Sequence, residues 1–126
     1  MKVALDFDGT CCTHVYPNIG EDIGAIPVLK ELCKNGHTLI LWTMRSGKEY
    51  DAAVEWLKDR GVKVHSCDYF LNLQKTWTQS AKLYAQAHID DAAIGTPLTN
   101  KLNAVRPYVD WVVMRKHLVA QGLLPN

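Results

Sequence analysis

One short apolar run limits the folds open to this chain of 126 residues. The run Leu39–Trp42 lies between Gly36 and the Ser46-Gly47 pair, with no polar residue inside it. A near-continuous apolar run of this length, bounded by turn residues, predicts a strand that is buried on both faces. Such strands are typical of parallel sheets covered by helices. We therefore predict a strand over residues 37–43 within a parallel sheet.

The rest of the chain alternates between strand and helix patterns. Apolar residues at helical spacing predict a helix over 26–34, which Asn35-Gly36 ends. A capping box, Ser46-Gly47-Lys48-Glu49, predicts the start of a second helix that ends at Gly61. The other expected elements are strands over 2–7, 62–65 and 87–91, a loop over 66–79, helical turns over 80–86, and a last helix with Pro107 in its first turn and Gly122 at its end.

This alternation predicts an α/β fold with a parallel sheet. The composition, with 48% hydrophobic and 21% charged residues, is that of an ordinary globular protein. The length suits one domain over residues 1–126. Right-handed crossovers place the carboxyl ends of parallel strands at one edge of the sheet, and ligands bind at that edge. The residues that end the strands are therefore the first candidates for function.

The charge balance argues against two classes of protein. Lys and Arg total 14 and Asp and Glu total 13, so the net charge is +1. This value disfavours a strongly basic nucleic-acid binder and a polyacidic tail, although residues 101–126 form a locally basic segment. No apolar run approaches the roughly 20 residues that span a bilayer. The four cysteines form no C-x-x-C pair. We expect a cytoplasmic protein that does not bind membranes.

Polar side chains follow the predicted strands where they end. Asp6 and Asp8 close the first strand, Thr43 closes the second, and Asp90 and Asp91 close the fourth. Two carboxylates about 4 Å apart repel by about 4 kcal/mol at an effective dielectric constant of about 20. Four of them would cost a large part of a domain's stability, so the cluster needs protons or a cation to neutralise it. Oxygen ligands at an open site favour Mg²⁺.

Two simpler explanations of the first motif were weighed. An Asp before Gly at a strand end is ordinary turn chemistry, so Asp8-Gly9 alone decides nothing. An EF-hand loop that starts at Asp6 fails, because Cys11 and Pro17 stand where that loop needs Gly and Glu. Two carboxylate pairs that each close an apolar strand, with a Thr that closes a third, form a stronger signal than either pair alone.

In this order the motifs resemble those of the haloacid-dehalogenase-like (HAD) phosphohydrolases. The chain has an apolar strand that ends D-x-D-G-T (residues 3–10), a strand that ends in Thr43, and an apolar strand before Asp90-Asp91. The stretches 36–45 and 89–95 are similar to short bacterial and phage HAD hydrolases. The resemblance implies a three-layer Rossmann-like core with a parallel sheet. Only 32 residues separate Thr10 from Thr43, so we expect no cap domain and an open site.

The resemblance also implies catalytic roles. Asp6 would be the nucleophile that forms an aspartyl-phosphate. Asp8 would protonate the leaving oxygen and then take a proton from water. Thr43 and a lysine would hold the phosphoryl oxygens. We choose Lys82 for this lysine because it lies eight residues before the acidic pair, and Lys75 is the alternative.

Ligands of the metal and the substrate follow from the same resemblance. Asp6, the Asp8 backbone carbonyl and Asp90 would hold Mg²⁺, with Asp91 assisting. Gly9 lets a ligand approach the backbone, and Arg45 follows Thr43 directly, where it could contact a phosphate or form a salt bridge. The residues expected to bind substrate are Gly9, Thr10 and Arg45, and His14 in the segment 11–25 could touch substrate.

The implied function is a Mg²⁺-dependent phosphomonoester hydrolase. Its substrate would be a nucleotide, a sugar phosphate or a phosphorylated polynucleotide end, the last favoured by the open site and the basic segment. The alternative is a catalytically silent phosphate-binding or interaction module on the same scaffold. A receiver domain is disfavoured because receivers place the acidic pair after the first strand and the phosphorylated Asp after the third. Here the acidic pair Asp90-Asp91 follows the fourth strand and the proposed acceptor Asp6 follows the first. A homo-oligomer is expected from the last helix, which Trp111, Met114 and Leu118 make apolar almost all round.

Overall fold

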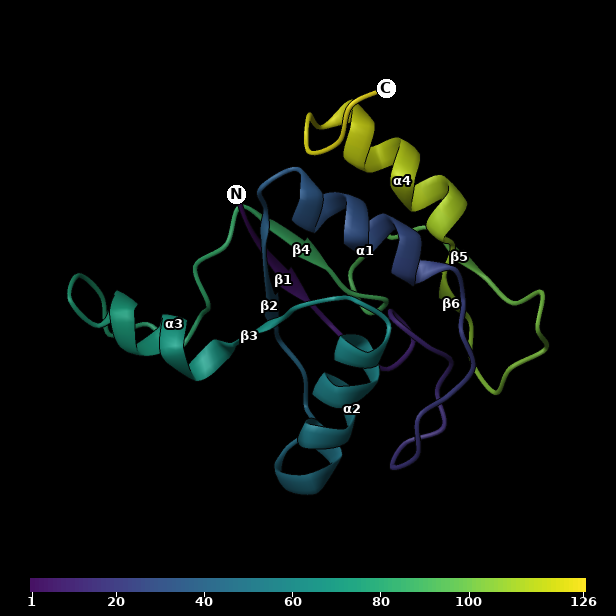
Figure 1. The fold of residues 1–126 in the computed structure, drawn as a ribbon, viewed down its shortest axis with the longest axis horizontal. Coiled ribbons are helices and arrows are strands. Elements are labelled where there is room, and N and C mark those ends of the chain that lie inside the picture. The colour runs from purple at the N-terminus through teal and green to yellow at the C-terminus, as the bar shows by residue number, and fades with distance from the viewer.

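A four-stranded parallel sheet forms the centre of the protein in the computed structural model, which describes residues 1–126 (Figure 1). The strands pair in the order β3-β2-β1-β4, and a separate antiparallel pair joins β5 to β6. In chain order the elements are β1 (Lys2–Leu5), α1 (Ala25–Lys34), β2 (Thr38–Leu41), α2 (Gly47–Asp59), β3 (His65–Ser66), α3 (Cys67–Gln74), β4 (Ala87–Ile89), β5 (Leu98–Thr99), β6 (Tyr108–Val109) and α4 (Trp111–Ala120).

Both faces of the sheet are covered, which explains the near-continuous apolar run of β2. Val3, Leu5, Leu39 and Leu41 belong to a large buried cluster that also takes in the buried residues of α1, α2 and α4. On the opposite face, Ala4 and Ile40 pack with Leu83 and with apolar residues of α3. The predicted α/β class, with a parallel sheet between two helical layers and no cap domain, is confirmed.

The segment between β3 and β4 differs from the prediction in two ways. Residues 67–74 form α3 rather than a loop, and Ser66 caps the helix by accepting a hydrogen bond from the backbone N–H of Asp68 at 3.2 Å. Residues 80–86 form no helix. The side chain of Gln74 binds their backbone instead: Nε2 donates to the carbonyls of Ser80 and Lys82, and Oε1 accepts from the N–H of Tyr84. A helix would use those groups internally.

The C-terminal segment also corrects the prediction. Pro107 precedes β6 and is not in the first turn of the last helix. The helix starts after Asp110, whose carboxylate accepts hydrogen bonds from the N–H groups of Val112 and Val113. Asp is a favoured N-cap residue, so this carboxylate, and not Pro107, sets the start of the helix. Gly122, with φ of 81°, lies just beyond the helix end as predicted.

Three smaller differences concern boundaries and exposure. The predicted strand over 62–65 is displaced to His65–Ser66. Ser46 does precede α2, but its side chain accepts no capping hydrogen bond. The apolar residues of α4 that suggested a homo-oligomer, Trp111, Met114 and Leu118, are buried in this chain's own core. An oligomer stays a prediction without that argument.

No helix of the structure has both the length and the hydropathy that crossing a membrane requires. All four cysteines are free thiols, and Cys11 and Cys12 are buried beside β1.

Candidate functional site

Three carboxylates meet at the carboxyl edge of the sheet. Leu5 of β1 pairs with Ile89 of β4, and the N–H of Asp6 donates to the carbonyl of Ile89 at 3.0 Å. This register sets Asp6 beside Asp90, and Asp91 follows in the turn. One oxygen of each carboxylate lies within 4.8 Å of the other two. An oxygen-only donor set of this spacing suits a hard divalent cation, so these three residues could hold Mg²⁺.

The hydroxyl of Thr10 joins the two halves of this carboxylate cluster. Thr10 is fully buried, and its Oγ1 donates to Asp6 Oδ2 at 2.8 Å. The same oxygen accepts the backbone N–H of Asp91 at 3.1 Å. The carbonyl of Thr10 accepts the indole N–H of Trp111 at 2.7 Å, which ties the motif to the start of α4. Thr10 therefore positions the acidic residues from inside the protein.

Replacing Thr10 by valine should lower the free energy of unfolding by about 1–3 kcal/mol. Valine has nearly the same shape but leaves the buried N–H of Asp91 without its acceptor. It also removes the hydrogen bond to Asp6. Urea unfolding measures the loss, and Thr10→Ser, which keeps the hydroxyl, is the matched control. A valine variant as stable as the wild type would show that the hydroxyl does not organise the site.

Burial changes the ionisation of Asp6. Removal of water around the side chain raises the pKa of Asp6 to about 8, against an ordinary value of 3.8. The Thr10 hydrogen bond acts in the opposite direction, and the nearby charges of Asp90 and Asp91 add to the rise. In the absence of a cation, Asp6 therefore keeps a proton at neutral pH. A cation at the cluster would reverse this by favouring the ionised form.

Gly9 and His14 close the cluster on the side of the segment 11–25. Gly9 has φ of 81°, and a Cβ there would overlap the ring of His14 and crowd the carboxylate of Asp91. His14 Nε2 lies 2.8 Å from Asp91 Oδ2, and both side chains are largely buried. The carbonyl of Gly9 accepts the N–H of Val109 at 2.9 Å. Only glycine fits this turn, as its place in the motif predicts.

Asp8 is not part of the carboxylate cluster and pairs with Arg45. The two Asp8 oxygens accept from Nε and an Nη of Arg45 at 2.8 and 2.7 Å. Arg45 also donates to the carbonyls of Pro17, Asn18 and Glu49. All five N–H groups of its guanidinium are thus used within the protein. Its side chain is 1% exposed, against 18% for Asp8.

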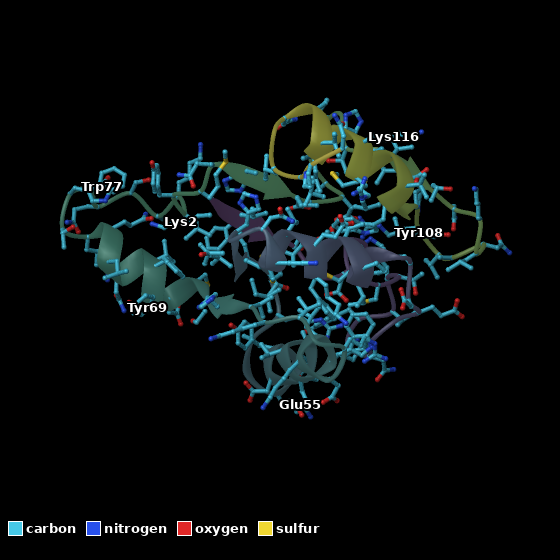
Figure 2. The ribbon with its side chains drawn as sticks, turned by 45° about the horizontal axis from the view of Figure 1, so that its top comes forward. Lys2, Glu55, Tyr69, Trp77, Tyr108 and Lys116 are labelled. Carbon is cyan, nitrogen blue, oxygen red and sulfur yellow. The ribbon has the colours of Figure 1, made fainter.

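The remaining predicted residues lie outside the carboxylate cluster. Thr43 is half-buried just beyond β2, and its Oγ1 accepts the backbone N–H of Arg45 at 3.1 Å. Lys82 and Lys75 are exposed, and neither forms an ion pair or side-chain hydrogen bond with the cluster. Lys82 lines a cavity with Trp77, which lies on the α3 side of the molecule, opposite Tyr108 (Figure 2).

Several residues that support the site were not among those predicted. Val109 and Trp111 hold the backbone of Gly9 and Thr10, although they lie about a hundred positions away along the chain. Val109 belongs to the antiparallel pair β5–β6, which is only two residues long in each strand and has no sequence signal, and Trp111 begins α4. The sequence predicts His14 only as a contact to substrate, and it gives no signal for the contact with Asp91.

One solved structure supports the fold. No family model matches the chain, and no curated protein matches it. Among solved structures, the chain is similar to a conserved protein from Bacteroides thetaiotaomicron, with 33% sequence identity and a TM-score of 0.75. The match covers 96% of this chain and 91% of that one. The chain belongs to the same family as this Bacteroides protein. The two members of the family therefore share the fold over nearly their whole lengths.

Proposed function

We propose that the protein is a Mg²⁺-dependent phosphomonoester hydrolase of the HAD type, with Asp6 as its nucleophile. The observation that carries the proposal is the carboxylate cluster at the edge of the parallel sheet, where oxygens of Asp6, Asp90 and Asp91 lie within 4.8 Å of one another. The motif order adds support, because the D-x-D-G-T strand, Thr43 and the acidic pair occur as they do in HAD phosphohydrolases.

The proposed reaction has two displacements. A carboxylate oxygen of Asp6 attacks phosphorus, the bond from phosphorus to the ester oxygen breaks, and Asp8 gives that oxygen a proton. Water then attacks the phosphorus of the aspartyl-phosphate and loses a proton to Asp8. Inorganic phosphate leaves and the Asp6 carboxylate is restored. Mg²⁺, when bound, would offset the repulsion between the anionic nucleophile and the anionic ester.

Binding of the phosphoryl oxygens is assigned to Thr43, to the backbone around Gly9 and Thr10, and to a lysine. Lys82 remains our choice over Lys75 on the motif order alone. Arg45 can contact a phosphate only by giving up one of its five hydrogen bonds within the protein. We place the protein in the cytoplasm, with a phosphorylated small molecule or polynucleotide end as its substrate.

Phosphate release from a panel of esters tests the proposal. The panel holds nucleoside monophosphates, sugar phosphates, an aryl phosphate and 5′- and 3′-phosphorylated oligonucleotides, each with Mg²⁺ and with EDTA. The expected result is release that requires both Mg²⁺ and Asp6. A folded protein that binds Mg²⁺ and leaves every ester intact would contradict the proposal.

One observation favours a silent phosphate-binding module as the second candidate. Both oxygens of Asp8, the proposed acid and base, are held by Arg45. A carboxylate locked in a salt bridge is poorly placed to exchange protons with a substrate. In that case the protein would bind inorganic phosphate in the presence of Mg²⁺ without hydrolysing esters.

The proposed cation site predicts how stability depends on pH. Without a cation, only the folded state keeps the Asp6 proton between the ordinary pKa of 3.8 and the folded pKa of about 8. The folded state is therefore stabilised by its tighter hold on the Asp6 proton, and this stabilisation is fully present below about pH 4. It should fall as pH rises toward 8, by up to about 1.4 kcal/mol per pH unit.

Urea unfolding in EDTA at a series of pH values measures this fall. The Asp6→Asn variant isolates it from other groups, because asparagine does not titrate. Millimolar Mg²⁺ should flatten the fall in the wild type, since the cation needs ionised carboxylates and stabilises the folded state more at pH 8 than at pH 5. Wild type and variant with the same pH dependence in EDTA would contradict the prediction.

A further inference from the structure

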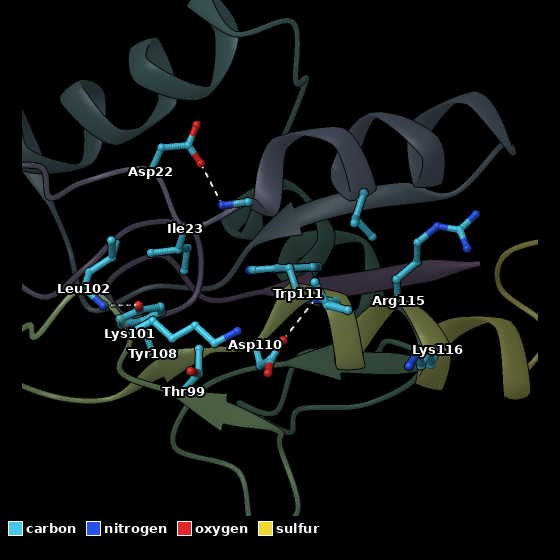
Figure 3. A pocket seen from close by; sticks show the side chains of 13 residues that line it. Asp22, Ile23, Thr99, Lys101, Leu102, Tyr108, Asp110, Trp111, Arg115 and Lys116 are labelled. Carbon is cyan, nitrogen blue, oxygen red and sulfur yellow. Dashed lines mark hydrogen bonds between the residues drawn. The ribbon is translucent and has the colours of Figure 1, made fainter.

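Two large cavities border the segment 13–24, which follows the first motif. The larger, about 590 Å³, lies between the start of α1 and α4 around Ile23, Tyr108 and Trp111 (Figure 3). It includes none of the carboxylate cluster. The second, about 410 Å³, includes His14, which contacts Asp91. Its lining residues are Thr13, His14, Val15, Ile19, Gly20, Glu21, Leu102, Asn103, Ala104 and Val105.

The second cavity adjoins the carboxylate cluster at one side chain, that of His14. The imidazole forms part of the cavity wall, and its Nε2 lies 2.8 Å from Asp91 Oδ2. Gly9, one residue after Asp8, has no side chain and leaves room for this contact. His14 therefore lies between the cluster and the cavity, and a group attached to a phosphoryl oxygen at the cluster reaches the cavity by passing this side chain.

Internal hydrogen bonds fix the first wall, residues 13–21. The N–H of Thr13 donates to the carbonyl of Glu21 at 3.1 Å, and Thr13 Oγ1 accepts the N–H of Glu21 at 2.9 Å. Arg45 donates to the carbonyls of Pro17 and Asn18 at 3.1 and 2.7 Å. The salt bridge that holds Asp8 therefore also holds this wall.

The opposite wall, residues 102–105, is fixed in a similar way. Asn100 and Ala104 exchange two hydrogen bonds, with Asn100 Oδ1 accepting at 2.7 Å and Nδ2 donating at 3.0 Å. The backbone N–H of Leu102 donates to the hydroxyl of Tyr108 at 2.9 Å. The two walls are set before any ligand binds, which lowers the entropic cost of binding.

The lining selects the chemistry of the occupant. Half of its ten lining residues are apolar, and the side chains of Val15, Leu102 and Val105 are exposed at its rim. Glu21 is its one acidic residue, and it contains no lysine or arginine. An added anionic group would thus meet the carboxylate of Glu21 with no lysine or arginine to pair with, and His14 already contacts Asp91. An uncharged or amine-bearing group would meet no repulsion from Glu21. The volume is that of a small-molecule site.

We infer that this cavity binds the leaving group of the substrate, and that the substrate is a monophosphate ester of a small, partly apolar alcohol with no further anionic group. The inference rests on the proposed function. It sets polynucleotide ends and nucleotides with several phosphates aside, since each brings additional negative charge to the wall that carries Glu21. His14 contacts the ester side of the leaving group.

Matched esters and matched variants test this inference. The esters are an aryl phosphate whose aryl group is uncharged, the same aryl phosphate with an added carboxylate, its amine-bearing analogue and a 5′-phosphorylated oligonucleotide. The variants are Val105→Glu and Glu21→Lys, both at exposed positions, with Leu73→Glu on α3 as the control. The readouts are KM and kcat for each ester.

The esters with an uncharged or an amine-bearing leaving group should have at least about tenfold higher kcat/KM than the ester with the carboxylate. Val105→Glu should raise the KM of the uncharged ester by about tenfold with little change in kcat. Glu21→Lys should narrow or reverse the discrimination against the carboxylated ester, and Leu73→Glu should change nothing.

Two failures are distinguishable. Asp6-dependent hydrolysis that favours the carboxylated ester or the oligonucleotide would overturn the inference and leave the proposed function standing. The same holds if Val105→Glu and Glu21→Lys behave like Leu73→Glu. No Asp6-dependent release from any ester would overturn the proposed function, and the inference with it.

Discussion

The Asp6→Asn protein should hydrolyse phosphate esters roughly 10⁴-fold more slowly than the wild type, or not at all. An amide nitrogen and oxygen cannot replace the carboxylate oxygen that attacks phosphorus, so no covalent intermediate can form. The side chain has almost the same size and keeps an oxygen for the Thr10 hydroxyl, which donates to Asp6 Oδ2 at 2.8 Å. The variant should therefore fold normally.

Stability measurements separate this catalytic effect from damage to the fold. In EDTA at pH 8 the variant should be at least as stable as the wild type. A neutral amide avoids the repulsion from Asp90 and Asp91 that helps to raise the pKa of Asp6 to about 8. The gain from Mg²⁺ should shrink in the variant, because one of three carboxylate ligands is lost. Substantial phosphate release by a folded Asp6→Asn protein would remove Asp6 as the nucleophile.

The carboxyl edge of the sheet could be predicted because it depends on local pattern and simple topology. Apolar runs at residues 3–5 and 39–42 and the short stretch Ala87-His88-Ile89 mark the strands, and parallel pairing brings their carboxyl ends together. The convergence of Asp6 with Asp90 follows from that pairing alone. The outcome needs no knowledge of side-chain rotamers.

The direction of Asp8 could not be predicted in the same way. A period of two places Asp6 and Asp8 on the same side of an ideal strand, but β1 ends at Leu5 and the chain turns at Gly9. Asp8 instead pairs with Arg45, which is 37 positions away and lies just before the start of α2. Which of several carboxylates a single arginine selects depends on packing that the sequence pattern does not contain.

The predictions of a loop over residues 66–79 and of helical turns over 80–86 are wrong for a related reason. Residues 67–74 have weak helical periodicity because α3 packs only on a small cluster around Ala4, Ile40 and Leu83. In residues 80–86, the buried amide of Gln74 replaces the hydrogen bonds that a helix would have formed. A single polar side chain outside the segment decided its conformation.

Replacing Arg45 by methionine should lower the free energy of unfolding by about 3–5 kcal/mol, the range for breaking a buried ion pair. Methionine fills much of the same space but removes five hydrogen bonds. It also removes the stacking of the guanidinium on the rings of Phe7 and Tyr16, at 5.0 and 5.2 Å from their centres. Asp8 is left with an unpaired charge. Arg45→Lys should recover only part of the loss, because lysine cannot make the two-pronged contact.

The Asp8→Asn/Arg45→Met double variant identifies the source of the loss. If the unpaired charge dominates, neutralising Asp8 should return a large part of the stability that Arg45→Met removes. If the backbone carbonyls of Pro17 and Asn18 dominate, the double variant should stay as unstable as Arg45→Met.

The same variants decide between the two predicted roles of Arg45. If Arg45 is a salt-bridge partner that fixes Asp8 and the segment 13–21, Arg45→Met should lower both the free energy of unfolding and kcat. If Arg45 is a phosphate ligand, Arg45→Met should instead raise KM and leave the urea midpoint unchanged. That second outcome would contradict the structural role.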